Sequence, residues 1–170
     1  MDRLDYIYCL FCSTRHENTV SKVLRNKGYT VIPIMAKRDT VQGGNNKQMI
    51  RHLLPGYVFF GVGEKITITD ERKILSNEYM IRLLNYSDGT KELRGRDLEF
   101  VKLFINNNGI IGLLEAIEVG SWVTITEGSL KDFNGEVVKV NRKRKCALVE
   151  FELFENNNRV WLSYKVMENS

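Results

Sequence analysis

The feature that most constrains this chain is a change in its hydrophobic pattern near residue 110. Before it, strand-like runs over 6–12, 29–35, 56–62 and 79–86 alternate with helix-like runs over 16–28, 71–77 and 95–109. After it, short β-rich runs follow one another with turn residues between them, which is typical of a small barrel. These patterns predict an α+β fold: an N-terminal domain over 1–106, in which helices flank a sheet, a linker over 107–117 and a C-terminal β-barrel over 118–170.

The stretch RHLLPGYVFF, residues 51–60, places a proline, a glycine and a tyrosine before an apolar strand. Proline cannot donate to a sheet ladder, so Pro55 belongs at the first residue of a strand or on an edge. Gly56 adds no bulk there, and Tyr57 presents an aromatic ring with a polar tip. This composition favours a strand entrance that docks a partner.

The composition is that of an ordinary globular protein, with 43% hydrophobic and 27% charged residues. No apolar run approaches the roughly 18 residues of a transmembrane helix, and the first residues do not resemble a signal peptide. Three cysteines, an odd number, argue against a disulfide framework and for a reducing compartment. We therefore expect a cytoplasmic protein.

Residues 118–154 resemble the KOW motif of the NusG family of transcription factors. The matching elements are Gly120 before the first strand, the turn Glu127-Gly128, the loop Asp132-Phe133-Asn134-Gly135 and the ELF run at 152–154. A glycine at 135 also has a physical reason, because a tight bend at a barrel corner leaves no room for a Cβ atom.

The N-terminal part resembles the NGN domain of the same family. Its markers are the aromatic first strand, Glu17 at the start of the first helix, a Gly-Gly hairpin tip and LLPGYVFF. Two departures stand out: Ile7-Tyr8 replaces the usual Trp-Tyr, and Leu54 replaces the usual Phe before Pro-Gly-Tyr. The chain therefore looks similar to a specialised paralogue of the LoaP or RfaH kind, nearer to LoaP.

The resemblance implies docking on RNA polymerase. In this family the NGN domain places a hydrophobic depression on the tip of the polymerase clamp helices and favours the pause-resistant state. Carried over position by position, the depression is lined by Phe11, Leu54, Tyr57 and Leu83, and Thr67 with Thr69 lies near a second contact, the polymerase gate loop. Each buried apolar anchor contributes roughly 1.5–3 kcal/mol. The alternative is that these are ordinary core and strand residues.

The resemblance also implies a protein partner for the KOW domain, such as a ribosomal protein or a termination factor. Leu130 and Phe133 fall in the loop that would meet it, although Phe133 could equally close the end of the barrel. Val137, Val138 and Val140 favour strands, so we expect a constitutive barrel.

The excess positive charge lies in the first third of the chain. Residues 1–53 hold nine Lys and Arg against four Asp and Glu, whereas 54–106 hold eight of each and 107–170 hold eight against nine. A basic face suits RNA or DNA, and a solvated surface is the alternative. The candidate nucleic-acid residues are Arg15, His16, Lys37, Arg38, Lys47 and Arg51, with Arg142, Lys143 and Arg144 in a KOW turn. We expect Lys37 and Lys47 to lie near each other across a hairpin.

No constellation supports catalysis, a metal or a cofactor. Cys9 and Cys12 form a CxxC inside a strand, where positions three apart face opposite sides. His16 and His52 lack ligand partners in the sequence, and no phosphate-binding loop is present. We therefore expect no enzymatic activity.

The resulting hypothesis is a monomeric antitermination factor that rides on bacterial-type RNA polymerase and is recruited through a leader RNA hairpin. One alternative is a general NusG-type elongation or termination cofactor. Another, from a different class, is a ribosome-associated RNA-binding protein that uses the KOW barrel.

Overall fold

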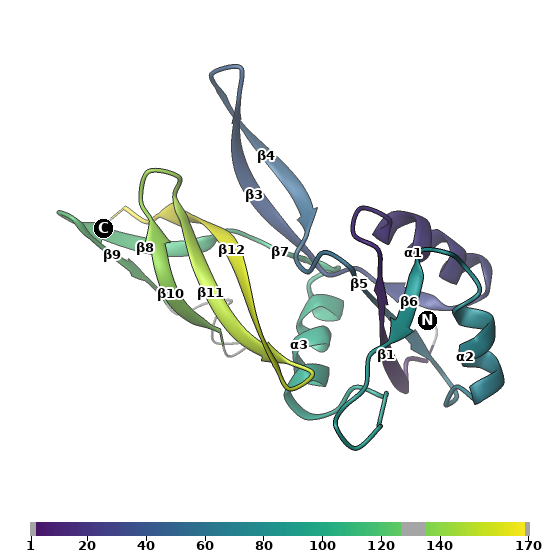
Figure 1. Ribbon diagram of the computed structural model, residues 1–170. Coiled ribbons are helices and arrows are strands. Elements are labelled where there is room, and N and C mark those ends of the chain that lie inside the picture. The colour runs from purple at the N-terminus through teal and green to yellow at the C-terminus, as the bar shows by residue number, and fades with distance from the viewer. Residues whose placement is uncertain (1–2, 127–134, 169–170) are drawn as a thin grey trace.

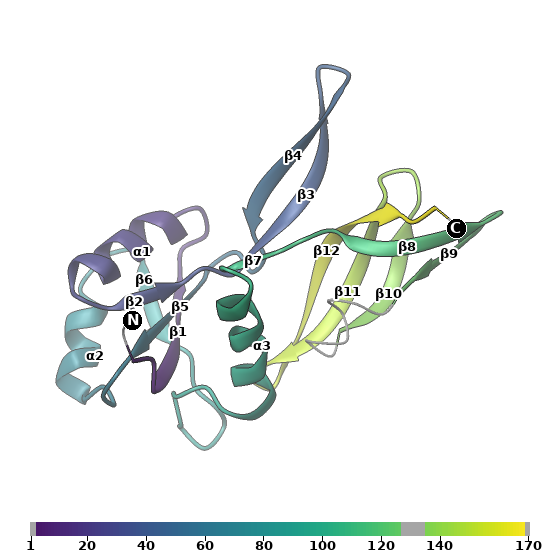
Figure 2. The ribbon, with the colours of Figure 1, turned by 180° about the vertical axis from the view of Figure 1, so that it is seen from behind.

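The computed structural model describes residues 3–126 and 135–168 and contains two units side by side, with one helix between them (Figures 1 and 2). The N-terminal unit holds an antiparallel sheet in the order β2-β5-β1-β6. Its strands are β1 (Tyr6–Cys12), β2 (Thr30–Ile32), β5 (Tyr57–Val62) and β6 (Met80–Leu83). The predicted α+β fold, in which a helix-flanked antiparallel sheet precedes a small β-barrel, is confirmed.

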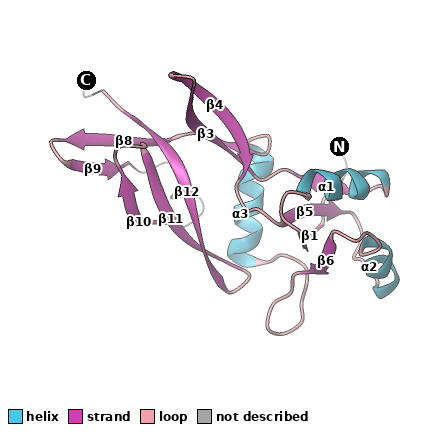
Figure 3. Ribbon diagram, turned by 45° about the horizontal axis from the view of Figure 1, so that its top comes forward, coloured by secondary structure: helices cyan, strands magenta, loops and turns pink. Residues whose placement is uncertain are grey.

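Helices cover both faces of this sheet because its central strands are apolar on both sides. Tyr8 and Leu10 of β1 pack under α1 (Glu17–Asn26) and α2 (Ile68–Ile74). The alternate residues Ile7 and Cys9 belong to the cluster under α3 (Gly95–Asn106). Successive side chains of a strand point to opposite faces, so this single run supplies two cores. The three helices of the described residues all lie in the N-terminal unit (Figure 3).

The tip of a long hairpin projects beyond both units (Figure 1). It consists of β3 (Met35–Gln42) and β4 (Asn45–His52), joined at Gly43 and Gly44, whose φ values are 60° and 79°. This conformation suits glycine because it has no Cβ. At its base, β3 pairs in parallel with β7 (Ile110–Ile111).

The C-terminal unit is a nearly closed sheet of five strands in the order β10-β11-β12-β8-β9. The strands are β8 (Leu114–Val119), β9 (Trp122–Ile125), β10 (Glu136–Asn141), β11 (Cys146–Leu153) and β12 (Asn156–Val166). Only the β8–β12 pairing, among the described strands of this sheet, is parallel. The alternate residues Ala147, Val149 and Phe151 of β11 fill its interior.

The segment predicted as a linker, 107–117, is held in place along much of its length. Ile110 and Ile111 pair with β3, and Leu114 and Ala116 are buried at the start of β8. The apolar character of this segment therefore reflects packing against both units.

Several predicted element boundaries differ from the structure: the strand expected over 79–86, for example, spans only Met80–Leu83, and two further differences have clear physical reasons. The second helix begins at Ile68 instead of residue 71, because Thr67 is its N-cap. The Thr67 hydroxyl accepts a hydrogen bond from the Asp70 N–H, and the Asp70 carboxylate accepts one from the Thr67 N–H. The strand expected over 29–35 ends at Ile32, since Pro33 cannot donate to the ladder. None of the helices in the described residues is long and apolar enough to span a membrane.

Candidate functional site

Phe11 and Tyr57 form a half-buried aromatic pair at one end of the main sheet. They are directly opposed on β1 and β5, and their ring centroids lie 5.6 Å apart in an edge-on arrangement. Both pack against the α3-side core, yet both remain partly exposed. The structure thus brings together the two aromatic residues that the sequence indicated for docking.

A tight turn at Gly56 holds Tyr57 in this position. Gly56 has φ of 87°, and its carbonyl accepts a bond of 2.8 Å from the Cys12 N–H. A Cβ on Gly56 would lie 3.1 Å from Cε2 of Phe11 and 3.2 Å from the Cys12 carbonyl oxygen. The glycine in Pro-Gly-Tyr is therefore required both by its backbone angle and by the close approach of β1.

Glu17 fixes the same turn from the start of α1. Its Oε1 accepts a 2.8 Å hydrogen bond from the Gly56 N–H, and the residue is only 5% exposed. Burial raises the pKa of this carboxyl, but backbone N–H groups, that of Gly56 among them, outweigh it and leave the pKa below its ordinary value. Glu17 is therefore charged at neutral pH and ties the helix to the strand entrance.

The other predicted docking residues are placed differently. Leu54 is 5% exposed and lies in the same core cluster as the aromatic pair. Leu83 is 3% exposed and pairs with Leu10 in the opposite cluster, on the other face of the sheet. Thr67 caps α2, with its Oγ1 accepting from the Asp70 N–H at 3.1 Å. Among the apolar residues of the set, Phe11 and Tyr57 are therefore the partly exposed ones, and Thr67 is exposed at the start of α2.

A hollow of about 280 Å³ lies next to Tyr57, between α1 and the segment that joins β2 to β3. Pro33, Ile34 and Met35 supply apolar walls, and His52 closes one side through a 3.0 Å bond between its Nε2 and Oδ1 of Asn18. An aliphatic side chain that contacted Tyr57 could enter this hollow.

The predicted cations of the hairpin are divided between its two faces. Lys37 is opposed to Ile50, whereas Lys47 is opposed to Thr40. Alternation along the strands therefore puts Lys47 on the face of Arg38 and Arg51, and Lys37 on the other face. The expectation that Lys37 and Lys47 lie near each other was wrong, because the register of β3 and β4 separates them by three positions.

The KOW cations occupy the turn between β10 and β11. Arg142 lies 3.7 Å from Glu118, and Lys145 lies 3.9 Å from the same carboxylate. Lys143 and Arg144 make no ion pair with the described residues. The turn stands beside the hairpin, since Arg144 and Thr40 line the same two hollows.

Arg15 and His16 lie apart from these cations, where β1 leads into α1. Arg15 has a φ of 72°, and the His16 ring stacks on Tyr79 with centroids 3.9 Å apart. Leu130 and Phe133, the predicted partner-binding residues of the KOW loop, lie outside the described residues. Cys9 and Cys12 fall in opposite cores, as expected for a CxxC within a strand.

Two comparisons with known proteins bear on this arrangement. A model of the family "Transcription termination factor nusG" matches residues 6–104, which is more than half of the chain. This chain belongs to the NusG family. A model of the KOW motif matches residues 119–152. The comparison with curated proteins finds no match.

A solved structure supports the same fold for the NusG-family chain. It is described as "Domain interaction in Thermotoga maritima NusG", aligns over 93% of each chain with a TM-score of 0.53 and shares 19% identity. At this identity the likeness establishes the arrangement of the fold and no more.

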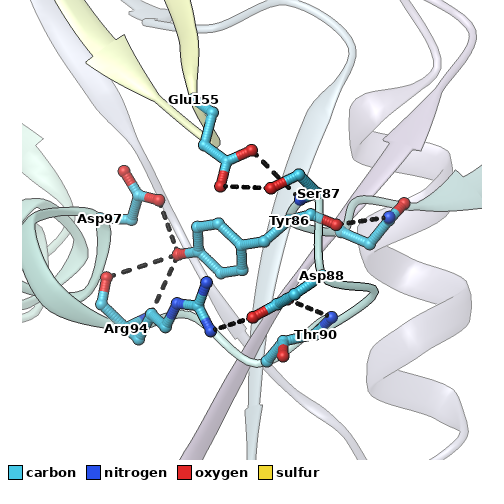
Figure 4. Close-up of polar contacts among 8 residues, drawn as sticks. Tyr86, Ser87, Asp88, Thr90, Arg94, Asp97 and Glu155 are labelled. Atoms are coloured by element: carbon cyan, nitrogen blue, oxygen red, sulfur yellow. Dashed lines mark hydrogen bonds and ion pairs between the residues drawn. The ribbon is translucent and has the colours of Figure 1, made fainter.

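The NusG-family chain also contains a contact between its two domains that the sequence did not reveal. Oδ2 of Asp97, in α3, accepts a 2.6 Å bond from the Tyr86 hydroxyl and a 3.2 Å bond from the N–H of Phe154 (Figure 4 draws the first). The ring of Phe154 packs against Tyr86 at 5.0 Å. Glu155 accepts two 3.1 Å bonds from the N–H and hydroxyl of Ser87. Asp97 thus joins both domains.

Burial shifts the pKa values of the Asp97 carboxyl and the Tyr86 hydroxyl in this contact. It raises the pKa of the Asp97 carboxyl, and the bonds from Tyr86 and Phe154 offset only part of that rise. Burial and the bond to Asp97 also raise the pKa of Tyr86. A second ring pair, Phe100 of α3 stacked on Phe151 of β11 at 5.3 Å, extends the contact.

The turn that makes the contact is strained. Phe154 and Glu155 are the two residues between the paired positions Leu153 and Asn156, and their φ values are 50° and 64°. A two-residue hairpin turn with both φ values positive prefers Asn-Gly. The ELF run that marked the KOW motif thus ends in a residue whose role is to dock on α3.

Proposed function

We propose that this NusG-family protein is a transcription elongation factor with antitermination activity, which docks on RNA polymerase through Phe11 and Tyr57 and is recruited through a leader RNA. The observation that carries the proposal is the half-exposed aromatic pair. The positive φ of Gly56 and the buried Glu17 carboxylate hold the pair in its partly exposed position. The hollow beside Tyr57 could accommodate an apolar side chain of the partner. Membership of a transcription factor family supports this reading.

The docking surface is suited to an aliphatic helix tip. Tyr57 and Phe11 offer ring faces, and burying each anchor would contribute roughly 1.5–3 kcal/mol. The adjacent exposed residue Arg82, opposed to Phe11 on β6, adds a cation at the rim. A partner with an apolar tip and acidic neighbours would therefore match this site.

The polymerase step is tested by titrating labelled full-length protein with bacterial core polymerase. Tyr57→Ala should weaken binding by roughly tenfold or more, as expected for the loss of one aromatic anchor. Tyr6→Ala is the matched control, because Tyr6 is 37% exposed at the far end of the same sheet. Equal effects of both substitutions would refute docking through this surface.

Recruitment is tested by single-round transcription through an intrinsic terminator, on templates with and without a candidate leader hairpin. Read-through that depends on the leader and is lost with Tyr57→Ala supports a recruited antiterminator. Equal read-through on both templates supports the second candidate, a general NusG-type factor, which family membership alone already favours.

A further inference from the structure

A groove lies between the β3–β4 hairpin and the KOW turn at residues 142–145. It consists of two hollows, of about 370 and 490 Å³, that share Asp39, Thr40 and Arg144. The smaller hollow also reaches Arg38 on the hairpin and Trp161 on the barrel. One wall therefore belongs to each domain. A bond of 3.2 Å from the Asp39 N–H to the Ser163 hydroxyl joins the walls.

The groove is strongly basic. Lys143 and Lys145 line the larger hollow, in addition to Arg144, and Arg38 lines the smaller one. Asp39 is the single carboxylate among the described lining residues. The lining therefore holds four cations and one acid, and one of the cations, Lys145, also lies 3.9 Å from Glu118 outside the groove. The Nε atom of Arg38 is buried and has no hydrogen-bond partner among the described residues. A buried donor of this kind is stabilised when an anion supplies the acceptor.

Two of these cations, one from each domain, line the same hollow. Arg38 of the hairpin and Arg144 of the KOW turn line the smaller hollow together with Cys146, and both guanidinium groups act to lower the pKa of the Cys146 thiol, which burial raises. Like charges held together repel each other in the free protein. A phosphate group placed between them would replace this repulsion with two charge-assisted hydrogen bonds.

The remaining lining suits RNA with unpaired bases. Trp161 is 36% exposed, so its ring can stack on a base, and Asn46 and Asn141 contribute side-chain amides to the lining that can bond to sugar hydroxyls. Aromatic rings among cations are the usual means of binding single-stranded segments, and the 2′-hydroxyl distinguishes RNA from DNA.

We propose that this groove binds the backbone and an unpaired base of RNA, and that bound RNA holds the two domains in their packed arrangement. The groove exists only while its walls face each other, so binding and domain packing stabilise one another reciprocally. The inference rests on the proposed recruitment through RNA and does not depend on polymerase docking.

Binding is tested with the full-length protein and a short RNA hairpin with an unpaired loop, by fluorescence anisotropy over a range of salt concentrations. Four phosphate contacts should give a slope of about −3 in log K against log salt, and Arg144→Ala should reduce its magnitude by about 1. Trp161→Ala should weaken binding roughly 5- to 150-fold.

Matched controls lie outside the groove. Lys102→Ala removes a cation paired with Glu99 on α3, and Trp122→Ala removes a ring that is 80% exposed on another barrel strand. Both should bind RNA as the unmodified protein does. Losses equal to those of Arg144→Ala and Trp161→Ala would overturn the site, and equal affinity for a DNA hairpin of the same sequence would overturn the assignment to RNA.

The coupling is tested with a variant that opens the domains from the opposite end of β11 (Figure 1). Phe154→Asn with Glu155→Gly removes the docking ring and carboxylate and gives the turn its preferred residues, so the barrel should still fold. It should bind the RNA hairpin more weakly than the unmodified protein does. The apparent affinity should fall in proportion to the fraction of molecules whose two domains are packed together. Unchanged affinity would overturn the coupling.

These readouts contain no polymerase, so they separate the two proposals. RNA binding lost with Arg144→Ala, together with polymerase binding insensitive to Tyr57→Ala, would refute the docking surface and keep the groove. The reverse result would refute the groove and keep the docking surface.

Discussion

At the scale of single residues, Gly56 determines how the chain presents Tyr57. Its φ of 87° is open to few side chains, and the Phe11 ring and the Cys12 carbonyl leave a Cβ only marginal space. Glu17 completes the turn by accepting the Gly56 N–H. The turn before β5, the end of β1 and the start of α1 thus together fix one aromatic ring.

Gly56→Ala should lower the free energy of unfolding by about 1 kcal/mol or more, because alanine is strained at positive φ. Denaturant unfolding followed by circular dichroism measures this. Gly112→Ala is the control, since Gly112 has no neighbour within 4 Å and its φ is not positive. The same loss in both variants would contradict the role assigned to Gly56.

The acid sensitivity of the fold should depend on Glu17. Its pKa in the folded protein lies below the ordinary value of 4.5, so it stabilises the fold above that pH and its contribution disappears as the pH falls through the folded pKa. Glu17→Gln should therefore flatten the decline of the unfolding free energy below about pH 4.5, as unfolding at a series of pH values would show. If the unfolding free energy of Glu17→Gln declined at low pH as steeply as that of the unmodified protein, this role of Glu17 would be refuted.

At the scale of elements, α3 is the helix that serves both domains. Phe100 and Phe104 belong to the cluster beneath the main sheet, while Phe100 also stacks on Phe151 and Asp97 accepts from Phe154. The short α2 depends on its cap instead, because few of its residues are buried and Thr67 and Asp70 form a reciprocal capping box.

Thr67→Ala should destabilise the protein by about 1 kcal/mol, the usual effect of removing an N-cap side chain. Thr67→Ser retains the hydroxyl and should be close to the unmodified protein in thermal unfolding. If Thr67 also contacts polymerase, Thr67→Ser will weaken polymerase binding without loss of stability, and this result would separate contact from capping.

At the scale of the whole molecule, the two domains pack through three kinds of contact: stacked rings, a shared buried carboxylate and a strained turn. Phe154 and Glu155 adopt positive φ values that cost roughly 1–3 kcal/mol each. Their docking on Tyr86, Asp97 and Ser87 offsets this strain. The turn is therefore better suited to the packed molecule than to an isolated barrel.

The double variant Phe154→Asn with Glu155→Gly should separate the domains. Loss of a buried Phe ring removes on the order of 3 kcal/mol from the contact, which shifts the equilibrium roughly a hundredfold toward the open form. Small-angle X-ray scattering should show a larger radius of gyration, with the barrel still folded. Trp122→Ala, on an exposed ring of the barrel, should leave the radius unchanged.

The sequence by itself determined the features that depend on neighbouring residues. The apolar run at 6–12, the helical spacing before Gly28 and the Asn-Gly stop after residue 106 correspond to β1, α1 and the end of α3. The strand entrance at Pro-Gly-Tyr and the division into two units followed from the same local patterns. Backbone conformation and turn chemistry act over a few residues, so a single sequence is enough to predict them.

The tertiary structure alone decided which distant residues meet. The register of β3 and β4 separated Lys37 from Lys47, and the pairing of β6 with β1 placed Leu83 on the face opposite Phe11. Asp97 and Phe154 are 57 positions apart, and so no local pattern marks their bond. The basic groove likewise joins a hairpin and a turn about a hundred residues apart, because domain packing depends on surface complementarity that only the folded chain creates.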